Sequence, residues 1–343
     1  MAWDRRKCLA LFASAIMAGA VVTTASAKEP APLNPPQKVT VAYVPIMKFA
    51  TLYVAADRGI FKKYGLDVDV EKVKSGTEAI AFLNKGSVDV GGIAIVTSLW
   101  NSWNRGLDIR IIAPGGREPM KGSTTELLLS TKAKGIKTIA DLKGKKIGAA
   151  GGPGSGAEYL IAKALERAHL TIRDVDLENI GNPDIPAALK SGAVDAALAA
   201  PPYSVQALKA GDATVLATDL TPGLMTVAFV GSGKFIKERP EAAERFVLAL
   251  TEAARLMQGK DYYSQPNMDA YMKYTTSTEA ALKAAKPSVY DPNMTIPLKG
   301  LADVERVHRE NGRTDYDKPI DLKKVVDTKF VDEALADIGK VKE

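Results

Sequence analysis

AFLNKGSVDV, at residues 81–90, recurs 106 positions later as AALKSGAVDA, at residues 187–196. The two copies share Ala, Leu, Gly, Val and Asp at five of ten matching positions. Each has the pattern of a helix end, a glycine cap and the start of a strand. Such junctions are common in α/β proteins, so the match alone could arise by chance. The order of the surrounding elements also repeats, which favours two similar structural units.

Strand and helix patterns alternate around the first copy. Strand patterns have β-rich or alternating composition, and helix patterns have apolar residues at helical spacing. A comparable order starts at Lys145 in the second half. Short connections between alternating elements predict an α/β fold with mostly parallel sheets covered by helices. The predicted elements of the first unit are strands at 39–44, 66–73 and from 88, and helices at 50–63 and from 77.

The repeat predicts two lobes connected twice. Apolar strand-like runs at 125–131 and 226–230 flank the second unit and are natural crossings between lobes. We assign residues 38–130 and 222–343 to lobe 1 and residues 131–221 to lobe 2. The part after Phe235 is mainly helical, and its clearest amphipathic helix spans 241–258.

Residues 1–27 have the composition of a cleavable signal peptide. Basic residues at 5–7 precede an apolar run at 9–22, and the small residues at 25–27 suit signal peptidase. The run is shorter than a membrane-spanning helix requires. We expect export to the periplasm by the general secretory (Sec) route, although the two arginines could also indicate the twin-arginine (Tat) route. Residues 28–37 contain four prolines and predict an extended spacer.

Composition disfavours several classes of function. The only cysteine, Cys8, lies in the signal, so disulfides, thiol nucleophiles and zinc–thiolate sites are not expected. The formal net charge of +6 is mild and dispersed, without a basic run interleaved with aromatics, so nucleic acid is not an expected partner. His169 and His308 stand beside charged residues, and we expect both to be solvated. We therefore predict no metal site, cofactor or catalytic residue, and a protein that is not an enzyme.

Ligands of open α/β sheets bind beyond the carboxyl ends of the strands, where four segments of this chain are expected to meet. The sharpest is the glycine-rich segment 152–156, between a strand at 146–149 and a helix from Ala157. Free N–H groups at that helix start favour an anion, although Ser155 and Thr97 could simply cap their own helices. The predicted ligand-binding residues are Pro45, Met47, Lys48, Phe49, Thr97, Ser98, Arg117, Gly154, Ser155, Gly156, Pro202 and Tyr203.

Some of these patterns have alternative interpretations. Residues 152–157 also fit the dinucleotide pattern G-x-G-x-x-A, a weak signal on its own. Arg117 could bind an oxyanion through two hydrogen bonds from its guanidinium, or it could be an exposed loop arginine. Phe49 and Tyr203 are placed to wall an aromatic ligand, whereas Trp100 and Trp103, three apart on a helix, are expected to pack.

The chain resembles the nitrate/sulfonate/taurine type of ABC-transporter substrate-binding proteins, a group that also includes binders of thiamine-pyrimidine precursors. The resemblance covers about residues 38–255 and rests on four motifs in order. They are LYVAADRGIFKKYGLDV at 52–68, DLKGKKIG at 141–148, GAVDA at 192–196 and PPY at 201–203.

This resemblance implies a type II periplasmic-binding-protein fold, whose lobes close on ligand about a hinge of two strands. It implies a monomer that delivers its ligand to a membrane permease with a cytoplasmic ATPase. Family members bind ligand through segments that correspond here to 45–49, Thr97-Ser98 and 154–156.

One departure from the family bears on the ligand. Pro201-Pro202-Tyr203 stands where many members have Trp-Glu-Pro, so a tryptophan wall and an acidic group are missing. This disfavours a cationic or pyrimidine ligand. We therefore expect the binding component of an importer for a small organic anion, either an aromatic carboxylate or a sulfonate. The alternatives are a ligand-sensing module for a signalling partner and a binder of a thiamine-pyrimidine precursor.

Overall fold

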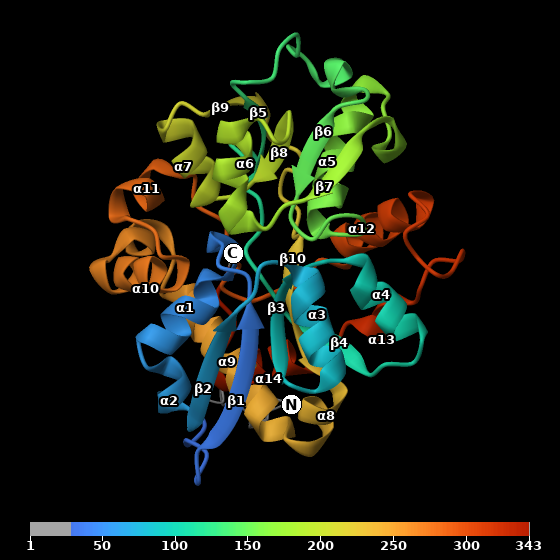
Figure 1. The fold of residues 1–343 in the computed structure, drawn as a ribbon. Coiled ribbons are helices and arrows are strands. Elements are labelled where there is room, and N and C mark those ends of the chain that lie inside the picture. The colour runs from blue at the N-terminus through green and yellow to red at the C-terminus, as the bar shows by residue number, and fades with distance from the viewer. Residues whose placement is uncertain (1–28, 343) are drawn as a thin grey trace, which may run out of the picture.

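Residues 29–342 of the computed structural model form two lobes, each built on a five-stranded sheet (Figure 1). The sheet of lobe 1 has the order β2-β1-β3-β10-β4, and that of lobe 2 has the order β7-β6-β8-β5-β9. The signal-peptide prediction lies outside the described residues. The strands of lobe 1 are β1 (Gln37–Tyr43), β2 (Leu66–Lys72), β3 (Val90–Ala94), β4 (Ile109–Pro114) and β10 (Val227–Ser232). Those of lobe 2 are β5 (Glu126–Ser130), β6 (Lys146–Ala149), β7 (Asp176–Asn179), β8 (Ala196–Ala199) and β9 (Ala213–Ala217).

The two sheets have the same topology. In lobe 1, β1 pairs in parallel with β2 and β3, and β10 pairs antiparallel with β3 and β4. In lobe 2, β6 pairs in parallel with β7 and β8, and β5 pairs antiparallel with β8 and β9. Both sheets are mostly parallel, as predicted, because only the fourth strand of each, β10 or β5, runs against the other four. In each sheet this reversed strand is the one that directly follows a crossing. This confirms the internal repeat and the α/β fold.

The repeated junction makes the same contacts in both lobes. The Asp89 carboxylate accepts a hydrogen bond of 2.9 Å from the backbone N–H of Thr40 on β1. The Asp195 carboxylate accepts one of 3.0 Å from the backbone N–H of Lys146 on β6. Each aspartate thus ties the start of one strand to the neighbouring strand, which explains why both copies carry Asp at this position.

Helices cover the faces of both sheets, and the last third of the chain packs mainly around lobe 1 (Figure 1). The predicted helix over 50–63 is interrupted, because Gly59 adopts a left-handed conformation with φ of 72°. The helices are α1 (Ala50–Asp57), α2 (Ile60–Lys63), α3 (Gly76–Lys85), α4 (Thr97–Asn104), α5 (Gly156–Leu165), α6 (Ile185–Ser191), α7 (Tyr203–Lys209), α8 (Gly233–Glu238), α9 (Pro240–Arg255), α10 (Gln265–Thr275), α11 (Glu279–Ala284), α12 (Leu298–Glu310), α13 (Leu322–Val325) and α14 (Lys329–Ile338). None of the helices within residues 29–342 combines the length and apolar character needed to cross a membrane.

Two segments connect the lobes: the first crossing, residues 115–125, and the second crossing, residues 218–226. They lie side by side, since the backbone N–H of Glu118 donates to the carbonyl of Leu224 at 3.0 Å. The predicted boundary at residue 130 places the run 126–130 in lobe 1, but this run is β5 and pairs within the sheet of lobe 2. The other boundaries of the two lobes stay predictions.

The described part of the proline-rich segment lies against lobe 1. The backbone N–H of Leu33 donates to the carbonyl of Tyr64 at 3.2 Å, and that of Gln37 donates to Gly65 at 2.9 Å. A Cβ atom on Gly65 would lie 2.3 Å from the Leu33 nitrogen, so only glycine permits this close approach. These residues therefore form part of the lobe 1 surface.

We expect the two junction glycines to differ in their response to alanine. Gly86 and Gly192 follow α3 and α6 with φ of 69° and 75°, so either substitution places a side chain in the left-handed region, at about 1–2 kcal/mol. A Cβ on Gly86 meets nothing within 4 Å, whereas one on Gly192 would lie 3.0 Å from Lys132 Cβ. Urea denaturation should therefore show a larger loss for Gly192→Ala than for Gly86→Ala. Unchanged unfolding free energies in both variants would refute this account.

Candidate functional site

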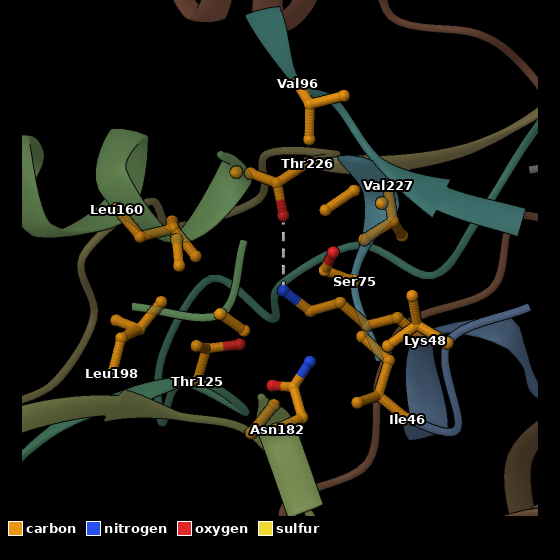
Figure 2. A pocket seen from close by; sticks show the side chains of 17 residues that line it. Ile46, Lys48, Ser75, Val96, Thr125, Leu160, Asn182, Leu198, Thr226 and Val227 are labelled. Atoms are coloured by element: carbon orange, nitrogen blue, oxygen red, sulfur yellow. Dashed lines mark hydrogen bonds between the residues drawn. The ribbon is translucent and has the colours of Figure 1, made fainter. Parts of the chain in front are cut away.

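A small cavity of about 60 Å³ lies between the lobes at the carboxyl ends of the inner strands. Residues from both lobes and both crossings line it (Figure 2). Lobe 1 and the second crossing contribute Val44, Ile46, Lys48, Ser75, Gly76, Ala94, Val96, Thr226 and Val227. The first crossing and lobe 2 contribute Thr125, Ala150, Gly156, Ala157, Leu160, Asn182, Leu198 and Ala200. This is the position in which α/β sheets usually bind ligands.

Lys48 supplies the charged group of the lining. Its side chain is almost completely buried, and Figure 2 shows the amine pointing into the cavity. The Nζ atom lies 2.5 Å from Glu118 Oε1 and 3.3 Å from Thr226 Oγ1. An ammonium group has three hydrogens to donate, so these two partners leave one for a ligand.

Glu118 is the counter-charge of Lys48 and lies on the first crossing. Its Oε2 atom accepts hydrogen bonds from the Thr124 backbone at 2.6 Å, the Thr124 hydroxyl at 2.8 Å and the Ser123 hydroxyl at 3.2 Å. Burial acts to raise the pKa of Glu118, but the Lys48 charge and the hydrogen bonds outweigh it and lower the pKa to about 2. The carboxylate is therefore ionised at neutral pH.

The glycine-rich loop before α5 is occupied by groups of the protein itself. Ser155 caps α5, since its hydroxyl accepts a hydrogen bond of 3.1 Å from the backbone N–H of Glu158. The Glu158 carboxylate in turn accepts the backbone N–H of Gly154 at 3.0 Å and the guanidinium of Arg313 at 3.0 Å. The anion-binding position predicted at residues 154–155 thus holds a carboxylate of this chain.

Among the described residues, backbone N–H groups without an acceptor remain at the start of α5, directly after Ser155. Gly156 and Ala157 open α5 and line the cavity, as Gly76 does at the start of α3. Within residues 29–342, no acceptor satisfies these three first-turn N–H groups. The Thr125 hydroxyl is also buried in the cavity wall without a partner there. Helix starts carry a partial positive charge, so this combination of donors suits an anion.

The lobes touch each other beside the cavity. The backbone N–H of Thr97, at the start of α4, donates to the carbonyl of Gly154 at 2.7 Å. A Cβ on Gly154 would lie 2.9 Å from Thr97 Oγ1, and a Cβ on Gly156 would lie 2.7 Å from Ala94 Cβ. The glycines of this loop therefore permit the close approach of the two lobes, and the arrangement is closed.

The predicted ligand-binding residues are distributed over several environments, and as ligand contacts they stay predictions. Lys48 and Gly156 line the cavity. Phe49 packs in the core against Phe229, with ring centroids 5.6 Å apart. Arg117 is held outside the lining by Asp291 at 3.1 Å and by the carbonyl of Thr295. Pro45 and Met47 flank the lining residue Ile46. Thr97 and Gly154 are hydrogen-bonded to each other where the lobes meet, and Ser98 and Ser155 are their neighbours in the sequence. Pro202 and Tyr203 line a separate groove between α7 and the residues after α10.

Sequence analysis did not identify several polar residues of the lining, namely Ser75, Thr125, Asn182 and Thr226. A usable signal existed for Ser75, because Ser75-Gly76-Thr77-Glu78 has the S-x-x-E spacing of a capping box directly after a strand. Its hydroxyl does accept the Glu78 backbone N–H, at 3.4 Å. Within the described part of the chain, no group of three or more His, Cys, Asp or Glu residues is placed to hold a metal ion.

Two α/β lobes of one topology, connected by paired crossings and closed over a cavity, define a periplasmic-binding-protein fold. The structure is similar to the periplasmic nitrate-binding protein from Synechocystis PCC 6803, with a TM-score of 0.73 and 17% identity over 89% of each chain. The model of the NMT1/THI5 like family matches residues 46–260, and the chain belongs to this family.

Two curated relatives resemble parts of the chain. A putative binding protein of Brucella abortus is 28% identical over 204 residues, which are 58% of this chain and 60% of the relative. The similarity therefore spans about three fifths of that relative. A putative aliphatic sulfonates-binding protein of Escherichia coli K12 is 34% identical over 148 residues, which are 43% of this chain and 44% of the relative.

Replacing Glu118 by glutamine should strongly destabilise the protein. The change preserves the size of the side chain but leaves the Lys48 ammonium buried without a counter-charge, which costs about 3–5 kcal/mol. Urea denaturation measures this loss. Glu126→Gln is the matched control, because burial and the neighbouring Glu118 and Asp219 raise the pKa of Glu126. That variant should stay within about 0.5 kcal/mol of the wild type, and an equal effect of the two changes would contradict the ion-pair account.

The same pair predicts a pH dependence of stability. The pKa of Glu118 is lowered from 4.5 to about 2 in the folded protein, so its contribution is present above pH 4.5 and is lost as the pH falls towards 2. The shift corresponds to about 3 kcal/mol of unfolding free energy. Denaturation curves collected across this window should show the decline in the wild type and a smaller one in Glu118→Gln. If the unfolding free energies of the wild type and Glu118→Gln decline in parallel with pH, Glu118 does not cause the pH dependence.

Proposed function

We propose that the protein is the extracytoplasmic solute-binding component of an ABC importer and captures a small organic anion between its lobes. The observation that carries this proposal is Lys48, a buried ammonium with one free hydrogen, in a cavity where the two lobes touch. Family membership supports it, as does the printed name of the Escherichia coli relative.

The hydrogen-bond donors of the cavity indicate that the proposed ligand is negatively charged. The ammonium of Lys48 points into the cavity. Gly156, Ala157 and Gly76 line it, and no acceptor within residues 29–342 binds their first-turn amides. Glu118 is turned towards Lys48, Ser123 and Thr124. Because Glu118 already neutralises Lys48, the ligand is held by directed hydrogen bonds rather than by excess positive charge. This favours a monoanion such as a sulfonate or a carboxylate over a multiply charged anion.

Aliphatic side chains determine the expected tail of the ligand. The apolar part of the lining consists of alanine, valine, isoleucine and leucine, and none of the lining residues described is aromatic. Phe49 and Tyr203, the aromatic walls expected from the sequence, lie outside it. We therefore favour an aliphatic sulfonate or carboxylate over an aromatic carboxylate.

The connection between the lobes supports capture by closure. Two paired crossings link lobes that otherwise meet through loop and helix contacts, and such a connection permits hinge motion. In this proposal the closed form is a monomer that docks on a membrane permease driven by a cytoplasmic ATPase. A ligand-sensing role would use the same closure with a different partner, and a neighbouring gene for a kinase instead of a permease would favour it.

A thermal-shift screen tests the proposal. Short alkanesulfonates and alkanecarboxylates should raise the midpoint of unfolding, since a ligand that binds only the folded state stabilises it, whereas spermidine, glucose and a thiamine-pyrimidine precursor should not. The double variant Lys48→Met/Glu118→Gln removes both charges together and should fold but lose the shift. Lys190→Met, on the exposed surface of α6, is the control and should retain it.

The outcome that overturns the proposal is stabilisation by a cation or sugar instead of any anion in the panel. An altered mass of a bound anion after long incubation would indicate an enzyme.

A further inference from the structure

Trp100, His308 and Ser155 form a hydrogen-bonded chain that crosses from lobe 1 to lobe 2. The indole N–H of Trp100, on α4, donates to Nδ1 of His308 at 3.3 Å. The Nε2 atom of His308 lies 3.2 Å from the carbonyl oxygen of Ser155, at the start of α5. His308 is on α12, which lies between α4 and α5 (Figure 1). The expectation of a solvated His308 was wrong, because its side chain is completely buried.

The two partners determine the protonation state of the ring. Indole can only donate a hydrogen bond, so His308 Nδ1 must accept and carries no proton. The Ser155 carbonyl can only accept, so Nε2 must carry the proton. Both bonds exist together only in the neutral Nε2–H tautomer. A second proton would place an N–H group on Nδ1, facing the N–H group of Trp100.

The charged groups around the ring are paired with one another. From α5, Glu158 binds Arg313 at 3.0 Å, and the Tyr159 ring packs edge-on against the imidazole. The Tyr159 hydroxyl donates to Asp303 of α12 at 2.7 Å. On α12 itself, Arg309 binds Glu305 at 3.1 Å. On α4, the neighbouring Asn101 donates to the carbonyl of Arg313, and Arg105 pairs with Asp315. These contacts leave no unpaired carboxylate among the described groups to stabilise an imidazolium.

The hydrogen bonds that link Trp100, His308 and Ser155 help to position one wall of the cavity. Ser155 directly precedes Gly156 and Ala157, which line the cavity at the start of α5. The neighbouring residue Gly154 accepts the inter-lobe hydrogen bond from Thr97. The hydrogen bond from His308 to the Ser155 carbonyl therefore also fixes the position of Gly156 and Ala157 relative to lobe 1.

We propose that His308 is a positioning residue that joins the lobes in the closed arrangement, and that protonation of its ring releases this joint. The joint depends on the contacts of α4, α5 and α12 and not on the identity of any ligand, so it goes beyond the proposed solute binding. It makes closure sensitive to acid.

The pH window follows from the surroundings of the ring. Burial lowers the pKa of His308 from 6.5 to about 4, against the opposing effect of the Ser155 carbonyl and with a further lowering by Arg313. In an opened form the ring meets solvent, and its pKa returns towards the ordinary value. The joint is therefore intact above pH 6.5 and weakens as the pH falls from 6.5 towards 4.

Tryptophan fluorescence reports on the joint without any ligand. Trp100 and Trp103 are the tryptophans that follow the predicted signal peptide, so Trp103→Phe in the chain lacking residues 1–27 leaves Trp100 alone. A protonated imidazole quenches a neighbouring indole, so emission should fall as the pH is lowered, with a midpoint well below 6.5. The quenching step should disappear when His308→Gln is added and persist with His169→Gln, the matched change at the other histidine.

Small-angle X-ray scattering of the ligand-free protein tests the effect on closure. Without ligand the lobes open and close in equilibrium, and loss of the joint shifts this equilibrium towards the open form. The average radius of gyration of the wild type should therefore increase as the pH falls from 8 to 4.5. Glutamine can donate to Ser155 and accept from Trp100, so His308→Gln should stay compact and insensitive to pH. His308→Ala should be expanded at both pH values, with circular dichroism confirming that each sample is folded.

The proposal is overturned if the wild type keeps one radius of gyration at both pH values, or if His169→Gln removes the response. If His308→Ala does not fold, the pH profile of His308→Gln against the wild type decides alone. Neither readout uses a ligand, so failure here leaves the thermal-shift test of solute binding intact.

Discussion

The buried ion pair of Lys48 and Glu118 is the contact on which the arrangement of the site depends. It ties the loop after β1 to the first crossing, and the hydrogen bond to Thr226 ties the same amine to the second crossing. Neither charge can be buried alone without a cost of several kcal/mol, so loop and crossings must keep one geometry. The cavity wall and the connection between the lobes are therefore a single structural unit.

The fold could be predicted from the sequence because its signals are local. Gly86 and Asp89 lie in one short helix–strand junction that the sequence repeats at 192 and 195, although each aspartate then binds a neighbouring strand. Lys48 could be identified as a candidate because it follows the first strand. Thr125 and Thr226 could not, since polar residues at strand ends are common and only the folding of the two crossings brings these to one cavity.

His308 shows how a signal can be present and still be misjudged. Its charged neighbours in the sequence, Arg309 and Glu310, suggest solvent exposure. Helical periodicity gives the opposite result, because Leu301, Val304 and His308 recur at the spacing of one helix face, and all three are buried. The periodic pattern was the better guide because burial depends on the face of the helix rather than on adjacent residues. No local pattern identifies the hydrogen-bond partner of His308, because Trp100 is more than two hundred positions away in the sequence.

The polar contacts of the closed protein fall into two kinds with different consequences. Lys48 and Glu118 belong to lobe 1 and its crossing, so separation of the lobes leaves their bond intact. The contacts from Thr97 to Gly154 and from His308 to Ser155 span the lobes, and opening exposes each donor and acceptor to water. Exchange of such a bond for water costs only about 0.5–1.5 kcal/mol. Opening also separates the buried Glu158 carboxylate of α5 from Arg313, so an ion pair as well as these hydrogen bonds holds the lobes together. The pair of Lys48 and Glu118 stays together in both arrangements, so the charges beside the cavity are not disturbed by the motion.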